Sequence, residues 1–130
     1  GYVCKVLTDI AGSSHWFDRG FITYAVQSKQ DLLGVPADIL MQHGAVSEAT
    51  VQAMAEGVLA NSQAHVSVAI SGIAGPGGGS LEKPVGLVCF AWATRGGECR
   101  AESMQFGGNR DAVRRQAVAH ALNGVLDCLG

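Results

Sequence analysis

A glycine-dense stretch at residues 70–80 is the first feature of the sequence that points to a binding site. It reads Ile-Ser-Gly-Ile-Ala-Gly-Pro-Gly-Gly-Gly-Ser between two apolar segments. Glycine lets a backbone come close to a ligand, and its N–H groups can cradle an anion. Neither the dinucleotide fingerprint G-x-G-x-x-G opening a helix nor the P-loop Gly-Lys-Ser/Thr is present. Glycine content alone therefore leaves two alternatives open, an anion-binding loop and a long ordered turn without a ligand.

Two lysines could act as bases beside a nucleophile. Residues 80–83, Ser-Leu-Glu-Lys, match S-x-x-K, a spacing that sets an amine one helical turn from a serine. Pro84 follows and the companion motifs are absent, so we assign this match no role. Lys29 is the other candidate. Most lysines are solvated, but one held near a serine with a lowered pKa can serve as general base, so both interpretations of Lys29 stay open.

The cysteines and histidines predict no metal site and no cofactor. No C-x-x-C or H-x-x-x-H pair occurs among the four of each residue type. The chain has enough apolar residues to form a stable core without disulfide bonds. We therefore expect reduced thiols in a cytoplasmic protein rather than two disulfides.

Composition indicates one folded domain. The chain has 130 residues, of which 48% are hydrophobic and 15% charged, and its net charge is -2. No basic cluster exceeds Arg114–Arg115, so we expect neither nucleic acid nor an acidic membrane as partner. No apolar run is long enough to span a membrane. A small molecule is the expected partner, and the extensive apolar surface suggests a homo-oligomer.

Helical spacing and strand-forming runs predict the elements of the first half. Val3, Val6, Leu7 and Ile10 form a helical stripe that Gly12 would end. Residues 21–26 are rich in β-formers and predict a strand. Two short helical segments follow. Ser28 would cap the first, over 29–33, which ends at Gly34, and the second covers 35–42.

The second half predicts a helix, three strands and a last helix. Ser47 is a typical N-cap for a helix to about Ala60, and residues 66–70 and 85–93 predict strands, the second covered on both faces. A turn at 95–98 leads to a more polar edge strand over 99–106, and the last helix begins at Asn109 or Arg110. This alternation predicts an α/β fold, a three-layer α/β/α sandwich around a mixed, mostly parallel sheet.

Several phrases of the sequence together resemble the CinA C-terminal domain family. They are Thr8-Asp9-Ile10-Ala11-Gly12-Ser13-Ser14, Gly20-Phe21-Ile22-Thr23-Tyr24, His43-Gly44-Ala45-Val46-Ser47, Ser71-Gly72-Ile73-Ala74-Gly75-Pro76 and Glu82-Lys83-Pro84-Val85-Gly86. The family comprises nicotinamide-nucleotide amidases. The resemblance implies that the carboxamide of nicotinamide mononucleotide is hydrolysed to nicotinate mononucleotide and ammonia. A non-catalytic module that binds a nucleotide or a protein partner is the alternative.

The resemblance also implies where the functional residues lie. Family members carry an Ala-Glu-Ser-Cys-Thr-Gly-Gly phrase with the serine nucleophile, and Gly1 resembles its last glycine. We therefore expect residues 1–130 to form a single domain whose N-terminal strand and first-helix start, with the nucleophile, precede Gly1. The remaining implied positions are catalytic Lys29, Tyr24 and Ser14, and substrate-binding Ser71, Gly72, Gly75 and Arg110. One departure is local, since Ala25-Val26-Gln27-Ser28 stands where the family has Ser-Asn-Glu-Ala.

Overall fold

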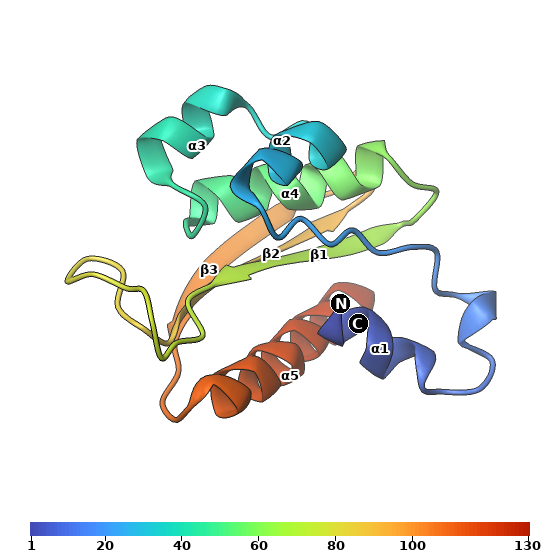
Figure 1. The fold of residues 1–130 in the computed structure, drawn as a ribbon. Coiled ribbons are helices and arrows are strands. Elements are labelled where there is room, and N and C mark those ends of the chain that lie inside the picture. The colour runs from blue at the N-terminus through green and yellow to red at the C-terminus, as the bar shows by residue number, and fades with distance from the viewer.

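The fold is built on a three-stranded sheet between two helical layers, as a computed structural model of residues 1–130 describes it (Figure 1). The strands are β1 (Val66–Gly72), β2 (Leu87–Thr94) and β3 (Cys99–Gln105), in the order β1-β2-β3. Both neighbouring pairs are antiparallel. The prediction of a mostly parallel sheet was wrong. Each pair is joined by a loop that reverses the chain, whereas parallel pairing needs a crossover such as a helix.

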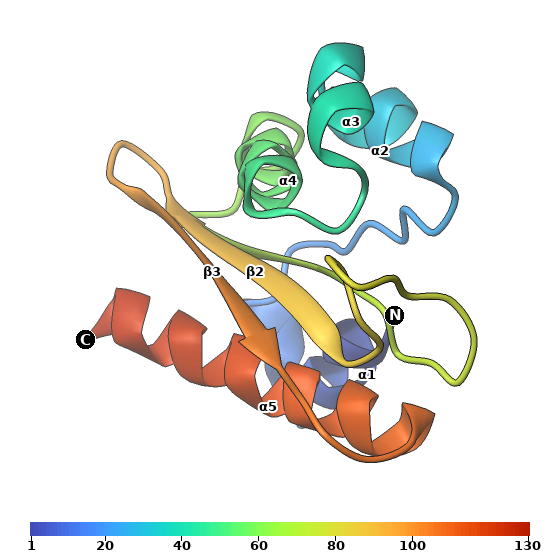
Figure 2. The same ribbon diagram turned by 90° about the vertical axis from the view of Figure 1, so that its left-hand side faces the viewer.

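The helices cover the two faces of the sheet unequally. On one face lies α4 (Glu48–Ala60), and α2 (Val26–Leu33) and α3 (Ala37–His43) pack beside it. On the other face lies α5 (Arg110–Leu129) with the short α1 (Tyr2–Thr8), as the view in Figure 2 shows. The predicted α/β/α layering is therefore confirmed. No helix combines the length and apolar composition that crossing a membrane requires.

The central strand β2 joins the two halves of the hydrophobic core. Six of its eight residues are buried, as predicted for a strand covered on both faces. Cys89, Ala91 and Ala93 point into the cluster under α4. Val88, Phe90 and Trp92 belong to the cluster under α5. The Trp92 indole also donates to the carbonyl oxygen of Ala121 at 2.9 Å, which fixes α5 against the sheet.

The two long helices begin at the caps that the sequence predicts. The Ser47 hydroxyl accepts the Thr50 N–H at 3.1 Å, and the Asn109 side chain accepts the Ala112 N–H at 2.9 Å. Gly34 ends α2 with a φ of 67°, a conformation that glycine adopts without strain. The end of α2, the helix of Lys29, and the start of α5, whose first residue is Arg110, are thus encoded locally.

Three predictions for the first third of the chain were wrong. The segment 21–25 is extended but not a strand, and α2 begins at Val26, so Ser28 lies inside that helix instead of capping it. No backbone hydrogen bond joins residues 18–24 to a neighbouring strand, which is why no ladder forms. The first helix ends at Thr8 with Asp9 as its cap, which leaves Ile10 exposed and Gly12 beyond the helix.

The outer edge of β1 is open along its whole length. The Arg95 N–H donates to the His65 carbonyl oxygen, and the Ile73 N–H donates to the Leu87 carbonyl oxygen. These two backbone hydrogen bonds show that the odd-numbered residues of β1 are the ones that bond to β2. In an antiparallel pair every second residue bonds to the partner strand, so Val66, Val68, Ile70 and Gly72 turn their backbone groups away from β2. The extended segment 17–25 passes along this edge in Figure 1. Tyr24, one of the predicted catalytic residues, belongs to this segment.

Candidate active site

Lys29 is the most unusual titratable group of the chain. It lies on α2 with only 6% of its surface exposed, and its ammonium donates a hydrogen bond to the carbonyl oxygen of Thr23 at 2.6 Å. No carboxylate pairs with it. Burial therefore lowers the pKa of the Lys29 amine from its usual value. A buried amine without a counter-ion is available in its neutral, basic form closer to neutral pH than a surface lysine is.

Thr23 holds the lysine and was not singled out by the sequence. It lies in the extended segment 21–25, where side chains alternate in burial: Phe21 packs against the core cluster and Thr23 is buried, while Ile22 and Tyr24 are exposed. The acceptor is a backbone carbonyl, so no residue type in the sequence could reveal it. The predicted general base is thus positioned by a turn between Thr23 and Lys29.

Tyr24 and Ser14 are not bonded to Lys29 in the structure. Tyr24 follows Thr23 directly, but its side chain is 86% exposed and makes no hydrogen bond. Ser14 lies in the single turn η1 (Ser13–His15), which contacts α1 and is exposed. Their predicted catalytic roles stay predictions.

The two substrate-binding positions on β1 face opposite sides of the sheet. Ser71 pairs with Cys89 and shares the α4 face with it, the side on which Lys29 also lies. Gly72 is the next residue and points to the α5 face. A Cβ built there would lie 2.8 Å from the Val88 side chain and 3.1 Å from the Leu87 carbonyl, so only glycine fits. The end of β1 therefore separates the lysine side of the predicted site from the arginine side.

Gly75 and Arg110 are brought together, although 35 positions separate them in sequence. The Arg110 guanidinium donates to the Gly75 carbonyl oxygen at 2.9 Å, across the α5 face of the sheet. Gly75 has a φ of 80° and a Cβ there would lie 2.5 Å from the Val85 side chain. The glycine loop therefore places a carbonyl where it orients the guanidinium, a group that binds phosphate bidentately.

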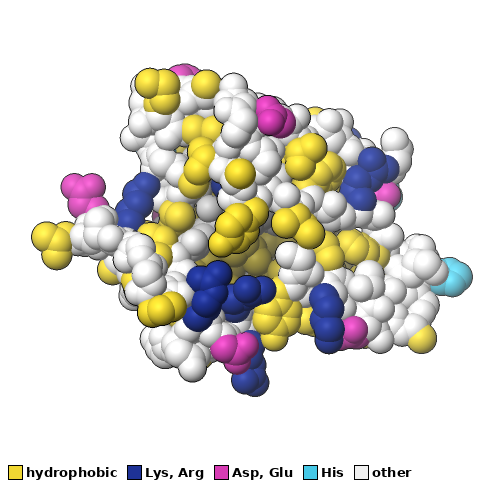
Figure 3. All heavy atoms as spheres, viewed as in Figure 1, with side chains coloured by type: hydrophobic (Ala, Val, Ile, Leu, Met, Phe, Trp, Pro, Cys, Tyr) yellow, Lys and Arg dark blue, Asp and Glu magenta, His cyan; other side chains and the backbone are white.

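Arg114 is a further cation that the sequence analysis left without a role. With Tyr2, Arg110 and Asp111 it lines an open hollow of about 350 Å³, and its guanidinium lies 5.7 Å from the centre of the Tyr2 ring. Its spacing of four from Arg110 on a predicted helix could have revealed it. Figure 3 shows Lys and Arg side chains gathered beside hydrophobic side chains in the middle of this face.

The N-terminus of the chain lies at the same place. Tyr2, the first residue of α1, lines the arginine hollow. A Cβ built on Gly1 would lie 3.3 Å from the Ile22 side chain, which neighbours Thr23. Gly1 and Tyr2 therefore lie between the segment that holds Lys29 and the arginine hollow.

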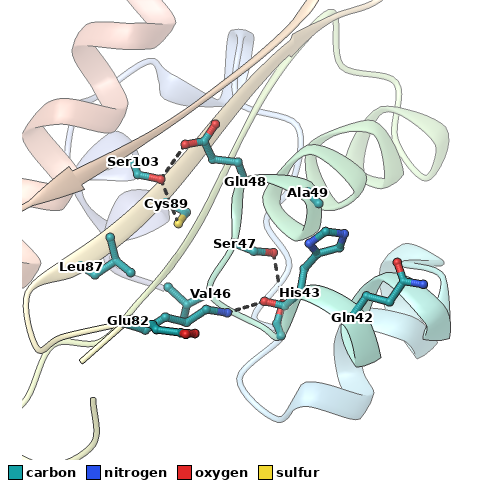
Figure 4. Close-up of a pocket in the computed structure, with 12 residues that line it drawn as sticks. Gln42, His43, Val46, Ser47, Glu48, Ala49, Glu82, Leu87, Cys89 and Ser103 are labelled. Atoms are coloured by element: carbon teal, nitrogen blue, oxygen red, sulfur yellow. Dashed lines mark hydrogen bonds between the residues drawn. The ribbon is translucent and has the colours of Figure 1, made fainter. Parts of the chain in front are cut away.

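A larger hollow of about 780 Å³ lies away from these residues. It opens between the start of α4, the loop before β2 and strand β3 (Figure 4). Lys83 donates there to the carbonyl oxygen of His43, and the Ser103 hydroxyl donates to the Glu48 carboxylate at 2.7 Å. None of the predicted catalytic or substrate-binding residues lines it. The side chains of Ser47, Lys83 and Ser103 are engaged in hydrogen bonds there.

Together these features define a class of protein: an α/β fold with a buried amine that has no counter-ion on one side of an open sheet edge and two guanidinium groups on the other. The chain belongs to the CinA C-terminal domain family, whose family model matches residues 1–129. The family resemblance predicted from the sequence is therefore confirmed.

Curated relatives carry names that state an activity. The chain is 58% identical over 122 residues to "Nicotinamide-nucleotide amidohydrolase PncC" of Escherichia coli K12, a match that covers 94% of this chain and 74% of that protein. It is also 52% identical to a "CinA-like protein" of Akkermansia muciniphila, over 98% of this chain and 31% of that protein. Relatives of this domain therefore occur both as shorter amidohydrolases and within much longer chains.

Solved structures support the same assignment. The competence/damage inducible protein CihA from Agrobacterium tumefaciens superposes with a TM-score of 0.98 at 45% identity, over all of this chain and 79% of that one. The competence damage-inducible protein A from Klebsiella pneumoniae gives 0.94 at 38% identity, over 99% of this chain and 80% of that one.

Proposed function

We propose that this protein is an amidohydrolase that converts nicotinamide mononucleotide to nicotinate mononucleotide and ammonia. Two kinds of observation support the proposal: the names of relatives such as the Escherichia coli amidohydrolase, and the buried amine of Lys29. Lys29 carries the mechanistic part, because a buried lysine without a carboxylate is costly to keep unless its lowered pKa serves a purpose. The alternative of a non-catalytic binding module has no comparable observation in its favour.

The nucleophile in this proposal is a serine on a strand that precedes Gly1 in the complete protein. That strand would lie along the open edge of β1, beside the extended segment 17–25, and would enter α1 through Gly1. The open edge offers unpaired backbone groups to such a strand. The β-forming residues 21–25 would then gain a partner on the side where they have none.

Catalysis then follows the usual course of serine amide hydrolysis. The serine hydroxyl attacks the carboxamide carbon while the neutral Lys29 amine accepts the hydroxyl proton. The tetrahedral intermediate expels ammonia, to which Lys29 returns the proton, and leaves an acyl-enzyme. Water attacks the acyl group and gives a proton to the same amine. The amine passes this proton to the departing serine oxygen, so the serine hydroxyl and the neutral amine are restored, and the acid product is released and ionises to the carboxylate. Tyr24 and Ser14 would help to relay or orient these protons.

Arg110 and Arg114 would hold the phosphate of the nucleotide. Both guanidinium groups border the hollow at the start of α5, and the Gly75 carbonyl fixes the direction of the first. Ser71, Gly72 and Gly75 would form the wall between phosphate and carboxamide. Phosphate contacts are made equally in ground state and transition state, so they would act mainly on KM.

The experiment that tests the proposal compares Lys29→Ala with a matched surface variant in the full-length protein. Ammonia release from nicotinamide mononucleotide is measured. Lys5→Ala is the control, because Lys5 is exposed and pairs with Asp9 on α1. We expect Lys29→Ala to lose at least about a hundredfold in kcat, the usual contribution of a general base, and Lys5→Ala to keep wild-type turnover. Near-normal turnover of Lys29→Ala would remove the lysine from the mechanism.

A further inference from the structure

The outer edge of β3 is a second open edge of the sheet, opposite to the one beside the candidate site. Bonds from Thr94 to Glu98 and from Phe106 to Gly86 fix which residues of β3 bond to β2. By the same alternation, the backbone groups of Cys99, Ala101 and Ser103 turn outward. No other backbone or side-chain group bonds to these three backbones. A row of free donors and acceptors is therefore available for pairing.

Two opposite charges flank the middle of this edge. Arg100 and Glu102 stand on either side of Ala101 and point to the α5 face, 3.7 Å apart at their closest N and O atoms. One oxygen of the Glu102 carboxylate also bonds the His120 imidazole of α5, and the other faces Arg100. Their side chains are 46% and 35% exposed. The Arg100 guanidinium lies 4.3 Å from the centre of the Trp92 ring, which holds it flat along the edge.

We propose that β3 pairs antiparallel with β3 of a second copy of this chain, about a two-fold axis through Ala101. Arg100 would then lie opposite Glu102 of the partner subunit, and Glu102 opposite Arg100 of the partner subunit. Residues directly opposite at non-hydrogen-bonded positions have their Cβ atoms about 4.5–5.5 Å apart, close enough for ion pairs. Such an interface is isologous, and the sheet becomes continuous across both subunits.

The charge pattern selects this register over its neighbours. A shift to an axis through residue 100 sets Arg100 opposite Arg100 of the partner subunit, and an axis through residue 102 opposes the two Glu102 carboxylates. Like charges directly opposite one another are destabilising. If the register between the two copies shifts by one residue, outward-facing backbone groups of one copy lie opposite backbone groups that in the other copy already bond to β2. Of the axes through residues 100, 101 and 102, only the one through Ala101 sets opposite charges against each other.

The other face of β3 offers no obstacle to pairing. Cys99, Ala101 and Ser103 point to the α4 face and are all small. Proline and β-bulges, which often protect edges against association, are absent from β3 and its regular pairing with β2, and its two charges on the α5 face have opposite signs. Antiparallel self-association is therefore the interaction for which this edge is suited.

The test measures the molar mass of the full-length protein by light scattering during size-exclusion chromatography. We expect twice the mass of one chain for wild type. Arg100→Glu makes the edge uniformly acidic and should weaken the dimer at least about tenfold, and adding Glu102→Arg to it should restore the dimer. Arg115→Glu, an exposed charge change on α5, is the control and should leave the dimer intact. A wild-type monomer, or an oligomer insensitive to Arg100→Glu, would overturn the proposal.

Disulfide trapping tests the register independently of charge. In the proposed dimer Ala101 lies opposite itself in a hydrogen-bonded pair, whose Cα atoms are about 5.5 Å apart, within the range a disulfide spans. Ala101→Cys should therefore form a cross-linked dimer under mild oxidation. Gln105→Cys, also on β3, is not opposite itself and should not. Equal cross-linking of the two variants, or none of Ala101→Cys, contradicts the proposed axis.

Discussion

The guanidinium of Arg110 donates a hydrogen bond to the carbonyl oxygen of Gly75, and so joins the first residue of α5 to the loop that leaves β1. The bond uses one of the five N–H donors of the guanidinium group. The other donors are available to the hollow that Arg110 and Arg114 both line. The glycine loop therefore acts on the candidate site through its backbone, which orients a cation.

Arg110→Ala should raise the KM for nicotinamide mononucleotide about tenfold or more and change kcat little. A hydrogen bond to a charged group contributes about 1.5–3 kcal/mol, and the phosphate is bound equally in the ground and transition states. Steady-state ammonia release measures both constants. Arg115→Ala is the control, because Arg115 is exposed and contacts only Asp111.

A substrate without phosphate separates binding from structure in this prediction. Nicotinamide riboside should be hydrolysed with the same kcat/KM by Arg110→Ala and wild type, because it has nothing for the guanidinium to hold. Equal losses with both substrates would mean that Arg110 supports only the loop through Gly75.

The pH dependence of the protein should report the Lys29 amine. Burial lowers its pKa in the folded chain, while the unfolded chain keeps the usual value near 10.5. Between these two values the unfolded state binds more protons, so the free energy of unfolding rises with pH across that window. Activity should also rise as pH increases through the lowered pKa, because the base must be neutral.

Lys29→Met provides the matched comparison for this dependence. It fills similar volume without a titrating group, so the free energy of unfolding measured in urea should lose the wild-type rise between the lowered pKa and about 10.5. Lys5→Met should retain that rise, because Lys5 is exposed. An unchanged slope in Lys29→Met would assign the rise to other groups.

The sequence predicted the helices better than the sheet. Caps at Ser47 and Asn109 and the stop at Gly34 depend on residues within one turn, and the structure has them. The segment 21–25 kept the in-out alternation of a strand, with Thr23 buried and Tyr24 exposed, but formed no ladder. Residue types give a segment its β-propensity. Whether the segment forms a strand depends on a neighbouring strand, which other parts of the chain must supply.

The candidate site was predictable only in part for a similar reason. The residue types left two interpretations of Lys29 open, a solvated lysine and a general base with a lowered pKa. The acceptor of its hydrogen bond is the Thr23 backbone, which carries no side-chain signature. The approach of Arg110 to Gly75 depends on how α5 packs under the sheet. Spacing in the sequence cannot predict that packing. Only the family resemblance placed Arg110 and Gly75 in one substrate-binding set.

Gly57→Ala should reduce both stability and activity because it displaces the helix that carries Lys29. A Cβ at residue 57 of α4 would lie 2.1 Å from the backbone carbonyl oxygen of Leu33, in the last turn of α2. Overpacking of this kind costs about 1–3 kcal/mol and outweighs the helix propensity gained. Chemical unfolding and kcat measure the two effects. Gly107→Ala should be neutral, since no atom lies within 4 Å of its Cβ position.

Thr50 and Ser47 should be energetically coupled through a shared acceptor. The carbonyl oxygen of Gly44, which ends α3, accepts the Thr50 hydroxyl at 2.7 Å and the Ser47 hydroxyl at 3.2 Å. Thr50 is fully buried, and Thr50→Val keeps its shape but removes the donor. Either hydroxyl alone still satisfies the carbonyl, so Thr50→Val should cost about 1 kcal/mol and Ser47→Ala about 1 kcal/mol, the latter chiefly as a lost helix cap.

The double variant leaves the Gly44 carbonyl without either hydroxyl and should be less stable than the sum of the single changes by about 1 kcal/mol. An unsatisfied buried acceptor costs more than a weakened one, and neighbours that share a partner are not additive. Urea unfolding of the four proteins of the cycle measures the coupling. Strict additivity would show that the two hydroxyls act separately. Turnover per folded molecule should stay at the wild-type level throughout, because neither side chain lies among the residues assigned to the candidate site.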